Sequence, residues 1–231
     1  MTPRPAHKRK PPPADLVEVF DEVEQRSPEW DALRCGVPTA SRFGTMMASG
    51  KDGGESVSRA RLLYQMAGEV LSGVPAETYV SRAMERGIRM EPAALEHYAF
   101  TRGVEVARVG FIRRTIPNQF GGALVVGCSP DGLVGDDGGV QVKTMQPDLL
   151  IELVDRGRFP SEHRAQCQGE MWVTGRRWWD LKIFYEGLPL SPVFRLERDE
   201  AYIAQVAAAV ETFAFDLRRL VERVKAKGGV R

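Results

Sequence analysis

The sequence has few cysteines, no long apolar run and almost no net charge. Its three cysteines, Cys35, Cys128 and Cys167, are widely spaced and odd in number, which argues against a disulfide framework or a structural zinc site and favours a reducing compartment. No apolar stretch approaches the roughly 20 residues that a membrane-spanning helix needs, so we expect no membrane partner. With 32 basic and 31 acidic residues and a net charge of +1, the chain lacks the strong positive charge of many nucleic-acid-binding proteins, although a local basic surface stays open.

The 231 residues are enough for one large domain with a buried core. Apolar residues make up 43% of the chain and charged residues 27%, a globular composition that excludes disorder along the whole chain. Residues 1–14 differ, because they combine prolines with a basic cluster. We therefore expect a disordered basic tail at 1–14 and a single domain at 15–231.

Hydrophobic periodicity favours helices near the N-terminus, strands in the middle, and then helices and strands in alternation. The expected helices are 15–34 with a break at Ser27-Pro28, 57–72, 79–102 with an interruption at Pro92, 147–156, 161–174 and 199–226. The expected strands are 104–114, 122–127, 139–144, 178–186 and 193–197. This order predicts an α/β fold, in which a single domain has a central mixed β-sheet flanked by helices.

The chemistry is concentrated in a turn and the strand that follows it. Asp131 lies in the turn Ser129-Pro130-Asp131-Gly132-Leu133, and Gln141 and Lys143 alternate on the next expected strand. Residues two apart share one face of a strand, and a hairpin would bring that face beside Asp131. Hydrolysis of a phosphodiester uses oxygen ligands that hold Mg²⁺ and a cation that orients water or stabilises developing charge.

The same pattern also fits an ordinary hairpin with no catalytic role. Gln141 and Lys143 stand beside Val140 and Val142, however, and burying an amide and an ammonium group in a sheet is costly unless they find partners. We therefore favour the catalytic interpretation.

The sequence resembles a known family, the lambda exonuclease-like alkaline exonucleases (YqaJ-type viral recombinases) of the PD-(D/E)XK nuclease superfamily. The resemblance runs from about residue 28 to about residue 205 and rests on five motifs in the right order. These are Trp30-x-x-Leu33-Arg34-x-Gly36-Val37-x-Thr39-Ala40-Ser41, Gly87-x-x-x-Glu91, Ser129-Pro130-Asp131-Gly132-Leu133, Gln141-Val142-Lys143, and Ala165-Gln166-x-Gln168-x-x-Met171-Trp172-Val173-Thr174.

The resemblance implies the restriction-endonuclease-like fold and a Mg²⁺-dependent 5′→3′ exonuclease, with Mn²⁺ as a substitute and two ions per site. Such an enzyme degrades one strand of linear double-stranded DNA from 5′-phosphorylated ends and leaves a 3′ single strand for recombination by strand annealing. The resemblance further implies a ring of three copies, a single-strand annealing protein as partner, and the cytoplasm of a bacterial host cell.

Residue roles are carried over from the resemblance position by position. The implied metal ligands are Asp131, Glu91, Gln141 and Val142. The implied catalytic residues are Lys143, Gln166, Gln141 and His163. The residues implied to hold the terminal 5′-phosphate are Arg34, Ser41 and Ser129, and those implied to contact DNA are Arg82, Met84 and Arg86. Simpler alternatives stay open for three of them, because His163 could be a satisfied structural histidine, Met84 a core residue and Arg34 a surface residue.

Gln141 departs from the family pattern, which has Glu or Asp at this position. An amide offers one carbonyl oxygen but no charge, so we expect weaker binding of a hard dication. Either Gln141 is natural, or it is a nearly isosteric replacement of Glu that stalls cleavage, and we favour the second explanation.

Two further functions compete with the exonuclease. If Gln141 is natural and abolishes metal binding, the chain is a DNA-end-binding protein that does not cut. The third alternative is a restriction-like endonuclease on the same fold.

Overall fold

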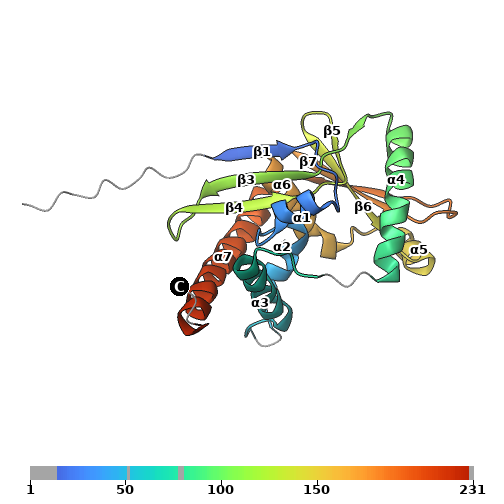
Figure 1. The fold of residues 1–231 in the computed structure, drawn as a ribbon. Coiled ribbons are helices and arrows are strands. Elements are labelled where there is room, and N and C mark those ends of the chain that lie inside the picture. The colour runs from blue at the N-terminus through green and yellow to red at the C-terminus, as the bar shows by residue number, and fades with distance from the viewer. Residues whose placement is uncertain (1–14, 51–52, 78–80, 229–231) are drawn as a thin grey trace, which may run out of the picture.

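The structure is a computed structural model that describes residues 15–50, 53–77 and 81–228. The tail expected at 1–14 lies outside the described residues. The described chain forms two β-sheets and the helices that pack on them (Figure 1).

The larger sheet has five strands in the order β2-β5-β6-β7-β8. Its strands are β2 (Val106–Ala107), β5 (Gly132–Val134), β6 (Gly138–Thr144), β7 (Trp178–Phe184) and β8 (Val193–Glu197). The β6–β7 pair is parallel and the other pairs are antiparallel. The smaller sheet is antiparallel, with the order β1-β3-β4, and consists of β1 (Leu16–Phe20), β3 (Phe111–Pro117) and β4 (Ala123–Cys128).

Helices cover both faces of the larger sheet. The helices are α1 (Pro28–Arg34), α2 (Ala40–Met46), α3 (Val57–Ser72), α4 (Arg82–Arg102), α5 (Pro147–Arg156), the 3-10 turn η1 (Ser161–His163), α6 (Arg164–Thr174) and α7 (Glu200–Gly228). Val140 and Val142 of β6 pack against Leu95 of α4 in one apolar cluster. A larger cluster on the other face joins the sheets to α2, α3, α6 and α7. The long helix α7 and helix α4 therefore lie on different sides of the fold, as Figure 1 shows.

Several elements match the sequence expectations residue for residue. The helices at 57–72 and 147–156 and the strand at 193–197 have the predicted bounds. Helix ends also follow known local rules. The Ser27 hydroxyl accepts a hydrogen bond from Trp30 N and caps the start of α1, and Gly73 ends α3 in the left-handed region. The mixed α/β class is confirmed.

Several expectations about the elements are wrong. Residues 16–20 form strand β1 instead of helix, because Val17 and Val19 are β-branched and the strand pairs along its whole length with β3. The single strand expected at 104–114 is two strands in different sheets, β2 and β3. Strand β5 was expected to be part of a turn, and the separate three-stranded sheet was not expected.

Helix α4 continues through Pro92 without the expected interruption. A proline inside a helix removes one hydrogen bond to the carbonyl four residues earlier, here that of Ile88. Both residues are exposed, so water can solvate this carbonyl. Packing of Ala94, Leu95 and Tyr98 in the core supports the rest of the helix.

Candidate active site

A cavity of about 480 Å³ lies between the N-terminal half of α4 and strand β6. Glu91 reaches it from α4, Asp131 from the turn before β5, and Gln141 and Lys143 from β6. The structure therefore brings together the residues that the alternation along β6 and the hairpin were expected to place side by side.

Asp131 is buried at the centre of this cavity. Its Oδ2 accepts hydrogen bonds from Gln141 Nε2 and from the backbone N–H of Val142, both at 2.6 Å. Burial and then the charge of Glu91 raise the pKa of Asp131 to about 6, while Lys143, the Val142 N–H and Arg108 act in the opposite direction. A buried carboxylate with a raised pKa gains most from a cation placed beside it.

The oxygen atoms in the cavity fit a divalent cation. The side-chain carbonyl of Gln141 is buried and has no hydrogen-bond partner among the described residues. The cavity that Gln141 lines is also lined by Val142 and by the two carboxylate residues Asp131 and Glu91. Hard oxygen donors of this kind suit Mg²⁺. No cluster of three or more His, Cys, Asp or Glu residues that could hold a metal occurs in the part of the chain that the structure describes, and an amide at position 141 leaves only two carboxylates in this cavity.

Both oxygens of the Glu91 carboxylate are engaged by arginines. Arg26 Nη2 lies 2.7 Å from Oε2, and Arg108 Nη2 lies 3.0 Å from Oε1. Arg26 also lines the cavity. The side chain of Glu91 is only 8% exposed, so the two guanidinium groups supply most of its charge compensation.

Gln166 lies in the first turn of α6 and His163 directly before this helix, and neither is among the described residues that line the cavity. Gln166 Nε2 donates a 3.0 Å hydrogen bond to Glu170 Oε1, one turn further along the helix. Burial raises the pKa of Glu170 to about 8. Burial and the charge of Lys143 lower the pKa of His163, which places His163 within electrostatic reach of the lysine. A continuous helix was expected from residue 161 to residue 174. The structure instead places His163 in the 3-10 turn η1, which precedes α6.

Arg34 and Ser129 meet in a second polar corner, beside Trp30. The Ser129 hydroxyl accepts hydrogen bonds from Arg34 Nη1 and Trp30 Nε1, both at 2.9 Å, and the Arg34 guanidinium stacks 4.1 Å from the Trp30 ring centroid. Burial and the nearby charge of Arg42 lower the pKa of Arg34 to about 10. A cation held in this way is not a freely solvated surface residue. Ser41 instead shares a 3.3 Å hydrogen bond with Thr39, and no hydrogen bond joins it to Arg34 or Ser129, all of them described residues.

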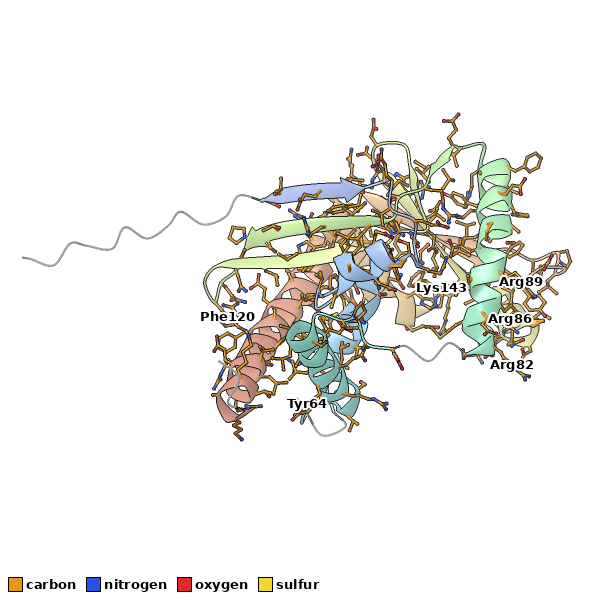
Figure 2. All side chains as sticks on the ribbon, viewed as in Figure 1. Tyr64, Arg82, Arg86, Arg89, Phe120 and Lys143 are labelled. Atoms are coloured by element: carbon orange, nitrogen blue, oxygen red, sulfur yellow. The ribbon has the colours of Figure 1, made fainter. Side chains whose placement is uncertain are left out.

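The first turns of α4 carry the residues expected to contact DNA. Figure 2 shows Arg82, Arg86 and Arg89 along this end of the helix. Met84 is 46% exposed and lines the cavity, which excludes the alternative that it is a core residue. The Arg86 guanidinium faces the ring of Tyr185 at 5.9 Å.

Comparison with known proteins identifies the family. Residues 29–177 match the model of the YqaJ-like viral recombinase domain. The chain belongs to this family. Among curated proteins, no sequence matches the chain significantly.

Solved structures support the assignment to the YqaJ-like family. An alkaline exonuclease from Laribacter hongkongensis, LHK-Exo, is 32% identical with a TM-score of 0.74, over 88% of this chain and 98% of that chain. LHK-Exo in complex with dAMP gives a TM-score of 0.75 with the same identity and coverage. A phage-related exonuclease from Haemophilus somnus 129PT has a TM-score of 0.60 over 84% of this chain and 99% of that chain, but at 14% identity this likeness shows the fold alone.

In this YqaJ-like chain, sequence reasoning missed three residues that the structure places at or beside the cavity. Glu170 stands four residues after Gln166, so helical spacing alone could have put both on one face. Arg26 and Arg108 had no such signal, because their contact with Glu91 joins segments that are far apart in the chain. Among the described helices, none is long and apolar enough to cross a membrane.

Proposed function

We propose that the chain is a Mg²⁺-dependent 5′→3′ exonuclease that degrades one strand of linear double-stranded DNA from 5′-phosphorylated ends. The observation that carries this proposal is the meeting of Asp131, Glu91, Gln141 and Lys143 in one cavity that has an orphaned buried oxygen. The similarity to an alkaline exonuclease, also solved in complex with dAMP, supports a DNA substrate.

The residues of the cavity would have different roles in the reaction. Asp131, Glu91, the Gln141 carbonyl and the Val142 carbonyl would hold one or two ions of Mg²⁺, or of Mn²⁺ in its place. Such an ion supplies charge neutralisation at the phosphate and a more acidic water. Lys143 stabilises the negative charge that develops on the phosphate. Gln166 and His163 would orient the attacking water or the phosphate.

The polar corner at Arg34 would set the direction of digestion. Ser129 stands two residues before Asp131, so a terminal 5′-phosphate bound by Arg34 and Ser129 would lie near the cleavage site. The guanidinium fork matches phosphate oxygens, and its stacking on Trp30 holds it in place. The Ser41 hydroxyl would contact the terminal phosphate only if its present hydrogen bond to Thr39 were broken. Arg82, Met84 and Arg86 on α4 would contact the duplex.

The biological setting follows from the family. We propose that the enzyme works in the cytoplasm of a bacterial host as a ring of three copies around DNA. It would leave a 3′ single strand for a single-strand annealing protein, its expected partner in homologous recombination.

Gln141 favours a second candidate function, a DNA-end-binding protein that does not cut. A restriction-like endonuclease on the same fold is the third. An assay with Mg²⁺ on linear and on closed circular duplex DNA, run for this chain and for Gln141→Glu, separates all three. The exonuclease digests only linear DNA, cutting of circles indicates the endonuclease, and end binding without cutting by either protein indicates the binding module.

A further inference from the structure

Glu91 is the proposed metal ligand from α4, yet each oxygen of its carboxylate already accepts a hydrogen bond from an arginine. Arg26 holds one oxygen at 2.7 Å and Arg108 holds the other at 3.0 Å. The carboxylate is 8% exposed, whereas the side chains of Arg26 and Arg108 are 43% and 51% exposed. Arg26 lines the active-site cavity, and both arginines line a second cavity of about 350 Å³ that shares Arg26 with it, so an incoming ligand can reach them.

The backbone at Arg26 indicates that its side chain has a function. Arg26 has a φ of 72°, and among the described residues it alone, apart from glycines, has a positive φ. Side chains rarely tolerate this conformation, so such strain at a cavity points to a functional constraint. The neighbouring Gln25 ties the strained turn to the site, because its Nε2 donates hydrogen bonds of 2.9 Å to Val109 O and to Pro130 O. These carbonyls adjoin Arg108 and Asp131.

A carboxylate held by two guanidinium groups cannot bind a dication well, because the cations repel each other and the oxygens are occupied. Arginine binds phosphate through the same fork that it uses for carboxylate. DNA in the cavity would bring phosphates to Arg26, which lines it beside Asp131 and Gln141. A phosphate and Glu91 thus compete for the same two arginines.

We propose that Arg26 and Arg108 form a binding site for a backbone phosphate of DNA and that they hold Glu91 until this phosphate arrives. The inference rests on the proposed nuclease function and goes beyond it, because it makes metal binding depend on DNA. Phosphate binding draws the arginines from Glu91, and the freed carboxylate then binds the metal. By thermodynamic linkage, DNA raises metal affinity and metal raises DNA affinity by the same factor.

The test measures binding, not cleavage. Arg26→Gly together with Arg108→Gln removes both guanidinium groups, and glycine relieves the strained backbone, so the variant should fold. Mg²⁺ affinity is measured by calorimetry without DNA and with a 5′-phosphorylated duplex whose terminal linkages are phosphorothioates that resist cleavage. Duplex affinity is measured by fluorescence anisotropy in EDTA. Arg102→Gln, on the same helix but three turns beyond Glu91, is the matched control.

We expect the double variant without DNA to bind Mg²⁺ at least about 5-fold more tightly than the parent chain, and to bind the duplex in EDTA several-fold more weakly. The increase in Mg²⁺ affinity caused by DNA should shrink by about the same factor. Unchanged or weaker Mg²⁺ binding by the double variant overturns the proposal, as does unchanged duplex affinity. Asp131→Ala separates failure of this proposal from failure of the nuclease function. If the cavity is not a metal site at all, Asp131→Ala leaves Mg²⁺ binding unaltered, whereas failure of this proposal alone leaves the loss of Mg²⁺ binding by Asp131→Ala in place.

Discussion

Asp131 is the residue on which the proposed chemistry depends most directly. In the Gln141→Glu background, which we expect to cut, Asp131→Ala should abolish Mg²⁺-dependent digestion of linear duplex DNA, because it removes a buried carboxylate that lines the cavity. The fold should survive, since the buried carboxylate with its raised pKa of about 6 is itself costly to bury. Digestion rates and circular dichroism of both proteins check this, and normal turnover by the variant would refute the proposed active site.

Arg34 should determine the preference for phosphorylated ends. Arg34→Ala removes a charged hydrogen bond to the terminal phosphate, which is typically worth about 1.5–3 kcal/mol. In the Gln141→Glu background, which we expect to cut, Arg34→Ala should slow digestion of 5′-phosphorylated duplex and reduce its advantage over 5′-hydroxyl duplex, measured as the ratio of the two rates. Arg82→Ala, an exposed arginine on α4, should weaken DNA binding while leaving the ratio unchanged. The same ratio in Arg34→Ala and the parent chain would place the phosphate pocket elsewhere.

Glu170 should make the stability of the fold depend on pH. Burial raises the pKa of Glu170 to about 8 in the folded protein, whereas in the unfolded chain the carboxyl titrates near its ordinary value. Between about pH 4.5 and pH 8 the folded state therefore holds a proton that the unfolded state releases, and stability falls as pH rises through this range. Glu170→Gln removes this loss.

Urea unfolding at pH 5 and pH 9 measures the effect. Relative to Glu170→Gln, the parent chain should lose on the order of 2–4 kcal/mol of unfolding free energy between the two pH values. An equal difference at both pH values would show that Glu170 is ionised in the folded state.

At the scale of single residues, sequence reasoning found the residues whose partners lie nearby in the chain. Asp131, Gln141 and Lys143 belong to one hairpin region, so alternation along a strand was enough to bring them together. Arg26 and Glu91 are 65 positions apart, and no local rule predicts their contact.

Helices and strands were predictable where several local signals in the sequence agreed. Helix α3 has an apolar stripe, the capping residue Ser56 and the terminal Gly73, all of which agree. Strand β1 had no such agreement, because its sequence also fits a helical pattern, and it forms through its pairing with β3, about 95 residues further along the chain. Long-range pairing decides such short segments, and periodicity alone does not reveal it.

The end of α3 offers a test at this scale. Gly73 has a φ of 69° and an added Cβ would contact nothing within 4 Å, so Gly73→Ala should cost about 1 kcal/mol through backbone strain alone. Gly68 lies exposed inside the same helix with equally open space, and Gly68→Ala should stabilise by up to about 1 kcal/mol. Thermal unfolding of both variants checks the pair, and equal effects of the same sign would contradict this account of the helix end.

At the scale of the whole molecule, the site exists only because the complete fold assembles it. Its parts come from the turn before α1, from α4, from the β5–β6 hairpin and from the start of α6. The sequence predicted the mixed α/β class and the order of most elements. It did not predict the second sheet, because β1 lies far from β3 in the chain and the pairing of these two strands depends on the tertiary fold.

We propose that this fold carries a metal-dependent exonuclease whose ion binding is weakened by Gln141. The site has two carboxylates, and Gln141 adds only a dipole. The affinity for metal should therefore fall more than the affinity for DNA, which depends on Arg34 and on other contacts with the DNA backbone. We expect the chain as it stands to bind linear duplex DNA but to cut it slowly or not at all.

The most direct test measures the rate of digestion of one 5′-phosphorylated duplex against Mg²⁺ concentration, for this chain and for Gln141→Glu. The account predicts that Gln141→Glu gains Mg²⁺-dependent digestion and needs less Mg²⁺ to reach half of its maximal rate. If the chain with Gln141 is already as fast as Gln141→Glu at low Mg²⁺, the amide is a competent ligand and the account of a weakened metal site is wrong.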